Sequence, residues 1–228
     1  MATRLYLPSD TIVPPFTPIV APGWDDVSIR VDTTTSTTKR SSAMTTVAFT
    51  DANAQNKDVL FMTFTSPELT AGQAITESQA IKAQIRGLQV ALTNNMFTAW
   101  HFSIQNSSGP TLTKALLAIT RDDVELATSL INRQFSATSL TGAYTTVAGD
   151  YIVVVIGTAG DPDVGSDHDS SLRVGDAAAS DLPEDDTDTT DLNPWIELAD
   201  TLTFAPLSTV GARAQLLSSG GMVGTVNV

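Results

Sequence analysis

The chain has 228 residues, a mass of 24.0 kDa and a mean hydropathy of +0.06. Hydrophobic residues make up 42% of it, which is enough for a buried core and excludes a wholly disordered chain. The lack of cysteine excludes disulfide scaffolds, thiolate metal sites and cysteine nucleophiles. A formal net charge of −13 argues against nucleic acid or an anionic membrane surface as a partner.

Residues 1–26 predict an extended N-terminal arm. Prolines interrupt it repeatedly, and proline fixes φ and biases the preceding residue toward extended backbone. The prolines are Pro8, Pro14, Pro15, Pro18 and Pro22. The arm is too apolar for a solvated linker, so it packs either on its own domain or on a neighbouring subunit, and the sequence leaves both open. The candidate partner-binding side chains are Leu5, Tyr6, Leu7, Phe16 and Trp24.

The N-terminus has no apolar run of signal-peptide length before the prolines. The longest strand-like apolar run, 151–156, is far shorter than the roughly 20 residues that a spanning helix needs. We therefore expect a protein without a membrane partner that stays in the compartment where it is translated.

Residues 27–205 predict an all-β domain. The segments 80–87 and 98–104 alternate between apolar and polar side chains, as half-buried strands do. Further candidate strands are 58–65, 112–120, 132–138, 151–156 and 201–204. About eight strands separated by short turns predict an antiparallel β-sandwich that is jelly-roll-like, with extended N- and C-terminal arms.

The segment 122–131 fits two patterns. Asp122 is suited to cap a helix with Glu125 three residues later, and Val124, Ala127, Leu130 and Ile131 would share a helical face. The same residues also fit a strand, so the sequence leaves the choice open.

The negative charge is concentrated in residues 161–200, which hold thirteen of the 25 acidic residues and one basic residue, Arg173. Within 161–169, four carboxylates lie close to a glycine and a proline, and such oxygen ligands suit Ca²⁺. They are Asp161, Asp163, Asp167 and Asp169. The spacing departs from an EF-hand loop, because Leu172 stands where the bidentate glutamate belongs. A solvated acidic loop is the alternative interpretation.

The second acidic run, 181–191, predicts a hydrated, extended loop because close like charges repel each other. A functional alternative is a docking surface for a basic patch on a partner. Calcium bridging is a third interpretation.

Catalytic signatures are missing from the sequence: it has no nucleophile elbow, P-loop, zinc-protease or dinucleotide motif. His101 lies on an alternating strand and His168 in an acidic loop, and neither position favours a general base. A pair of catalytic carboxylates stays open, since its geometry is invisible in sequence. We expect no enzyme and no catalytic residue.

Three tryptophans offer a different function, stacking on sugars. Trp100 fits the core better, because it alternates with Phe102 and Ile104. Trp24 and Trp195 follow Pro-Gly and Asn-Pro steps, which suits rings that anchor irregular segments on the sandwich.

The segment 206–228 predicts an apolar C-terminal tail. Its glycines oppose a stable helix, and its apolar residues favour a covered position. Two such arms on one sandwich indicate contacts between subunits and a homo-oligomer.

Three stretches of the sequence resemble virion structural proteins of tailed bacteriophages. They are Thr3-Arg4-Leu5-Tyr6-Leu7-Pro8-Ser9, Pro22-Gly23-Trp24-Asp25-Asp26, and Leu172 to Pro183 continuing through Asn193-Pro194-Trp195-Ile196-Glu197. The similarity covers most of residues 1–205 and includes no catalytic residue.

The resemblance implies a virion protein that assembles in the host cytoplasm, with the major capsid protein or tail proteins as partners. We expect a capsid decoration (cement) protein that stabilises the shell through its arms. The alternative is a tail-tip or fibre-associated sandwich that binds host-surface glycans, with Ca²⁺ as a candidate ion and no other cofactor.

Overall fold

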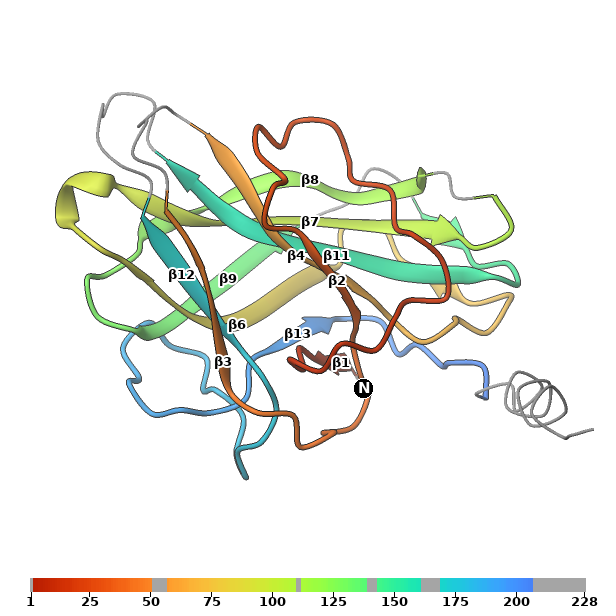
Figure 1. Cartoon of the computed structure of the whole chain (residues 1–228). Helices are drawn as coiled ribbons and strands as arrows, with labels where there is room; N and C mark the ends of the chain where they lie inside the picture. The colour runs from red at the N-terminus through yellow and green to blue at the C-terminus, as the bar shows by residue number, and fades with distance from the viewer. Residues whose placement is uncertain (1, 51–56, 110–111, 139–142, 161–168, 207–228) are drawn as a thin grey trace, which may run out of the picture.

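The computed structural model describes residues 2–50, 57–109, 112–138, 143–160 and 169–206. They form two large β-sheets packed face to face (Figure 1). The β6 sheet contains β1 (Thr3–Tyr6), β13 (Trp195–Leu198), β6 (Ala80–Gln89), β12 (Ser170–Val174), β3 (Thr45–Phe49) and β9 (Ile131–Thr138). The β11 sheet contains β2 (Val31–Thr34), β4 (Asp58–Thr65), β11 (Asp150–Gly160), β7 (Met96–Asn106) and β8 (Leu112–Glu125). A short ribbon joins β5 (Ala74–Ile75) to β10 (Tyr144–Thr145), and η1 (Leu92–Asn94) is a single helical turn.

The strand order is that of a jelly roll. In one sheet the neighbours run β3-β12-β6-β9, and in the other β4-β11-β7-β8. Read along the chain, these eight strands form the two sheets of a double Greek key. The predicted jelly-roll-like β-sandwich is therefore confirmed, with β1, β2 and β13 added at its margins and β2 running parallel to β4.

The core lies between the sheets, and the alternation that predicted the strands decides which side chains enter it. Ile81, Ala83 and Ile85 of β6 point inward, as do Trp100 and Phe102 of β7, and all five are 0% exposed. The rings of Trp100 and Phe102 stack with centroids 6.2 Å apart. Because strand residues two apart share a face, the residues between them point to the outer faces.

The segment 122–131 is neither a helix nor a single strand, because residues 126–130 connect two strands. β8 continues to Glu125 and β9 begins at Ile131, so the helical alternative is wrong. The capping pattern is overridden because Asp122 instead accepts a 3.3 Å hydrogen bond from Thr98 on the neighbouring strand.

The predicted strand 201–204 is wrong. Only Phe204 pairs there, in a single bridge to Leu69, and the strand lies earlier, at β13. The sequence pattern missed β13 because Trp195 and Ile196 point to opposite faces and both are buried, which removes the alternation.

The first residues of the chain belong to the sandwich. β1 pairs with β13 from Thr3 to Tyr6, and Leu5 and Leu7 are both 0% exposed within the core. Of the two packing alternatives for the arm, these residues take the one on their own domain. No helix in the described part of the chain is long and apolar enough to cross a membrane.

Candidate functional site

Residues 9–30, here called the N-terminal cover, lie on the outer face of the β11 sheet (Figure 1). Phe16, Val20 and Trp24 pack there against a small apolar cluster. The cluster is Leu60, Val153 and Val155. The Phe16 ring also meets the Tyr151 ring with centroids 5.2 Å apart. This face of the sheet is thereby closed by apolar contact.

Hydrogen bonds and a close ring contact fix the N-terminal cover to the sheet. The Gln105 side chain accepts from the Ile19 amide at 2.8 Å and donates to the Ile19 carbonyl at 2.7 Å. Further along, Trp24 lies on Gly157, where an added Cβ would be 2.6 Å from the indole and 1.9 Å from the Val59 carbonyl oxygen. Only glycine allows this approach.

His101 projects from β7 onto the face that the N-terminal cover closes, beside Val155. The alternation of residues 98–104 places His101 opposite the inward Trp100 and Phe102; its side chain does point to the outer face, but it is only 2% exposed. Burial lowers its pKa to about 4, and its Nδ1 has no hydrogen-bond partner. The imidazole is therefore neutral near pH 7.

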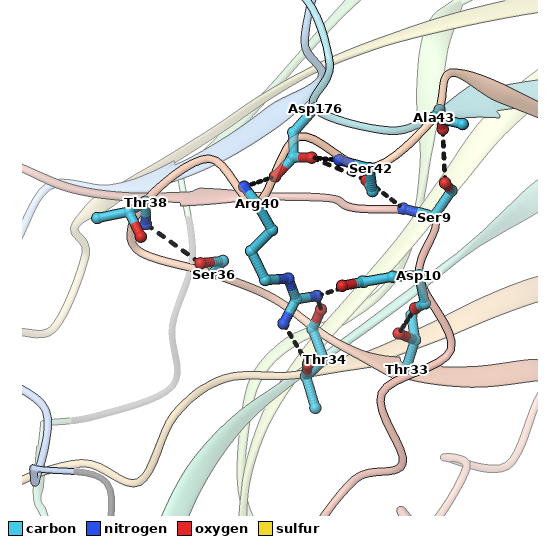
Figure 2. A network of polar contacts seen from close by, with 10 residues as sticks. All are labelled: Ser9, Asp10, Thr33, Thr34, Ser36, Thr38, Arg40, Ser42, Ala43 and Asp176. Atoms are coloured by element: carbon cyan, nitrogen blue, oxygen red, sulfur yellow. Dashed lines mark hydrogen bonds and ion pairs between the residues drawn. The ribbon is translucent and has the colours of Figure 1, made fainter.

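Asp176 ties the start of the N-terminal cover to the rest of the chain (Figure 2). Its carboxylate accepts from the amides of Arg40 and Ser42, both at 2.5 Å, and from the Ser42 hydroxyl at 2.8 Å. The Arg40 guanidinium then pairs with Asp10 at 2.6 Å, and the Ser9 amide donates to the Ser42 hydroxyl at 2.9 Å. Asp176 is 1% exposed, so this network is part of the folded interior.

Residues 176–194, here called the acidic cover, lie on the outer face of the β6 sheet. Basic side chains of the same protein form ion pairs with Asp181, Glu184 and Asp191 of this segment. The pairs are Arg4–Asp181 at 3.2 Å, Lys39–Asp181 at 2.9 Å, Lys82–Glu184 at 2.8 Å, Arg86–Asp191 at 3.0 Å, and Arg173–Asp191. The acidic run was expected to be hydrated or to meet a partner's basic patch; in this structure it meets the chain's own.

Two carboxylates of the acidic cover, Asp191 and Asp181, have a pKa below the usual value. Hydrogen bonds from Arg173, followed by its charge and that of Arg86, keep the pKa of Asp191 below its usual value. At Asp181, burial raises the pKa, but contacts with Lys39 and Tyr6 outweigh it and the net pKa is lowered.

Neutral contacts complete the acidic cover. The side-chain amide of Asn132 donates to the carbonyls of Pro183 and Asp185 at 2.8 and 2.7 Å. The Trp195 indole donates to the Leu182 carbonyl at 2.8 Å, and the Arg4 guanidinium lies 3.8 Å from the centre of the Trp195 rings. Trp195 is consequently an anchor and only 1% exposed.

The sequence offered one signal for these anchors. Lys82, Gln84 and Arg86 were predicted to share the polar face of a strand, and that face is the one that the acidic cover closes. Nothing local linked them to an acidic run about a hundred residues later.

The calcium prediction rests largely outside the described residues, where Asp161, Asp163, Asp167 and His168 lie. Asp169 is described, and its backbone carbonyl accepts from the Val90 amide at 2.9 Å. Within the described ranges, no group of three or more His, Asp or Glu side chains is placed to hold a metal ion.

The candidate partner-binding residues have different surroundings. Leu5 and Leu7 are in the core, whereas Tyr6 is half-buried and donates to Asp181 at 3.1 Å. Phe16 and Trp24 are half-buried against the β11 sheet. The apolar side chains of the N-terminal cover and β2 that remain exposed are Ile12 at 46%, Val13 at 83%, Val27 at 47% and Val31 at 37%.

No protein-family model and no curated protein matches this sequence. Among solved structures, a CocE/NonD family hydrolase from Staphylococcus aureus is 10% identical, with a TM-score of 0.43 over 88% of this chain and 36% of the hydrolase. The chain thus spans about a third of the hydrolase's length. The sugar-binding C-terminal domain of EclA is 12% identical, with a TM-score of 0.27 over 57% of this chain and 75% of the domain. A chain of infectious bursal disease virus, Gx strain, is 11% identical, with a TM-score of 0.24 over 78% of this chain and 48% of the viral chain. Likeness at this level carries no argument about activity or partners.

Proposed function

We propose that this protein is a non-enzymatic structural component of a tailed-phage particle, acting as a capsid decoration (cement) protein. Its partners are other virion proteins and further copies of itself. The proposal is supported by the positions of the stretches that resemble phage virion proteins, because they build the two covers. Pro22 to Asp26 seats the N-terminal cover on Gly157, and the stretch through Asn193-Pro194-Trp195 builds and anchors the acidic cover.

The observation that carries the proposal is the apolar surface left on the N-terminal cover. Val13 is 83% exposed and Ile12 46% exposed, whereas Phe16, Val20 and Trp24 of the same cover pack against the sheet. Val13 borders a shallow depression of about 240 Å³, formed with Phe16 and Asp32 among others. Exposed apolar side chains beside a depression are typical of protein–protein contacts.

The contact is therefore assigned to the surface around Val13. Leu5 and Leu7 fold into the sandwich, so deleting the whole arm would damage the fold as well as any contact. A point substitution on the exposed surface separates the two effects.

The test is co-sedimentation of the purified protein with particles that lack it. Val13→Asp places a charge on the proposed contact, and we expect binding to fall at least tenfold. The matched control is Val90→Asp, at a side chain that is 63% exposed in a distant turn, with binding unchanged. Equal binding by both variants would contradict the assigned contact, and no binding by the wild-type protein would contradict the decoration role.

An exposed Trp24 or Trp195 would favour the glycan-binding alternative. Trp195 is buried under the acidic cover and Trp24 is half-buried on Gly157, so neither ring is free as a stacking platform. We therefore propose only the structural role.

A further inference from the structure

The acidic cover does more than lie on a face of the sheet: it follows the outer edge of β9. β9 pairs with β6 through one edge, and alternate residues direct their amides to the other edge. There the backbone amide of Asn132 donates to the Asp188 carbonyl at 2.8 Å, and the backbone amide of Gln134 donates to the Asp186 carboxylate at 2.7 Å. Asn132 thus pairs with Asp188 and Gln134 with Asp186, so β9 and residues 186–188 run antiparallel. Residues 186–188 thus occupy the place of an added antiparallel strand.

Two arginines recognise oxygen atoms of this added segment. Arg86 donates to the Thr189 carbonyl at 2.7 Å and to the Asp191 carboxylate at 3.0 Å. Arg133 donates to the Asp186 carbonyl at 3.0 Å. The edge therefore selects an extended segment through its backbone amides, and the arginines select carboxylates and carbonyls on it.

The chain's own segment fills this edge incompletely. Arg86 and Arg133 are each 6% exposed, and the Nε of each is buried without a hydrogen-bond partner. A buried donor without an acceptor is destabilising. The Gln134 backbone amide is also met by the Asp186 side chain and not by a backbone carbonyl, because the acidic cover does not continue as a regular strand. A better-matched segment would therefore gain contacts that the acidic cover lacks.

We propose that the β9 edge, with Arg86 and Arg133, is a strand-addition site for an extended, carboxylate-rich segment of a partner protein. The acidic cover occupies this site in the isolated chain. Being tethered, it competes at a high effective concentration, and the partner segment binds only as the cover is displaced. This assignment goes beyond the decoration role and holds whether or not the protein is part of a particle.

The test measures binding of a labelled peptide to a protein whose own cover is loosened. The probe is a fluorescent peptide with the sequence of residues 183–192, read by anisotropy. Asp186→Ala combined with Asp191→Ala removes cover contacts while leaving the β9 edge intact. We expect this variant to bind the probe at least tenfold more tightly than wild type, and less tightly as salt is raised.

Two controls isolate the edge. Glu77→Ala combined with Asp123→Ala removes the same charge at two exposed side chains outside the acidic cover, and should bind the probe as weakly as wild type. A probe with asparagine in place of both Asp186 and Asp191 should bind the loosened variant more weakly. If the loosened variant loses its circular-dichroism signal, Arg173→Ala is the milder substitute, because Arg173 holds Asp191 without contacting β9.

Folded, loosened protein that binds the probe no better than the controls would overturn the proposal. A loosened variant that forms dimers by light scattering without the probe would also overturn the partner assignment, since a second copy's cover would then be the occupant.

Discussion

The N-terminal cover and the acidic cover lie on opposite outer faces of the same sandwich, and the sheets beneath them differ in character. The β11 sheet presents Val153 and Val155 to its cover, whereas the β6 sheet presents Arg86 and Asn132. One cover is therefore held mainly by apolar burial, and the other mainly by ion pairs and hydrogen bonds. Apolar contact resists salt and depends on shape, while exposed ion pairs weaken with salt and with acid.

The difference shows how one chain with a net charge of −13 folds around an acidic run. Arg4, Lys82, Arg86 and Arg173, although distributed from β1 to β12, converge on the acidic cover. Their attraction offsets the repulsion that the run would otherwise suffer. Asp176 joins the two systems, since it begins the acidic cover and fixes the loop that holds Asp10 of the N-terminal cover.

The largest effect is expected where the N-terminal cover approaches the sheet most closely. Gly157→Ala would push a Cβ to 1.9 Å from the Val59 carbonyl oxygen, which must move together with the Trp24 ring. We expect the free energy of unfolding to fall by about 3 kcal/mol, the upper range for overpacking. Urea unfolding measures it. Gly109→Ala, in open space, is the control, and an equal loss there would contradict the close-approach argument.

A pair of truncations compares the two covers directly. Trp24→Ala removes a half-buried ring and should cost about 2 kcal/mol at any salt concentration. Asp191→Ala removes partners of Arg86 and Arg173 at a side chain that is 40% exposed, and should cost about 1 kcal/mol or less, diminishing in 0.5 M salt. Urea unfolding at low and high salt gives both values. The same salt dependence in both variants would show that the covers do not differ in this way.

The strands of the jelly roll could be predicted from the sequence because each has one buried and one polar face. Residues 80–87 and 98–104 show this alternation, and both became strands with the expected inward residues. β1 carries the same signal, since Leu5 and Leu7 point inward while Arg4 and Tyr6 point outward, but the nearby prolines favoured an arm.

The covers could not be predicted in detail, because they depend on pairings between distant parts of the chain. The contacts Arg4–Asp181 and Arg86–Asp191 join residues more than a hundred positions apart. The sequence shows the charges but not which of them meet. In the same way, it shows Gly157 in an apolar run but not the indole that lies on it.

The covers should also respond to acid over different pH ranges. The pKa of His101 is lowered from 6.5 to about 4 in the folded protein, so protons bind preferentially to the unfolded chain below pH 6.5. The free energy of unfolding should therefore fall by about 2 kcal/mol between pH 7 and pH 5, because His101 lies under the N-terminal cover. The lowered pKa of Asp191 instead protects the acidic cover until the pH falls below the carboxylate's usual value of 3.8. His101→Gln should remove the first effect, as followed by urea unfolding across this range. A wild-type slope that persists in the variant would assign the loss to another group.

Asp122 of β8 lies between the two covers and is 8% exposed. Burial raises its pKa from 3.8 to about 6, although the amides of Asp123 and Val124 and the Thr98 hydroxyl oppose the shift. A carboxyl with a raised folded pKa destabilises the protein progressively as the pH rises from about 4 to 6, and the loss then stays constant. Asp122→Asn keeps an oxygen for the Thr98 hydroxyl and removes the charge, so its stability relative to wild type should be about 3 kcal/mol greater at pH 8 than near pH 4. Because Asp122 belongs to neither cover, this gain should be the same at low and high salt and should add to the cost of Trp24→Ala. A gain that is equally large at pH 4 would mean that the substitution acts through packing and not through the buried charge.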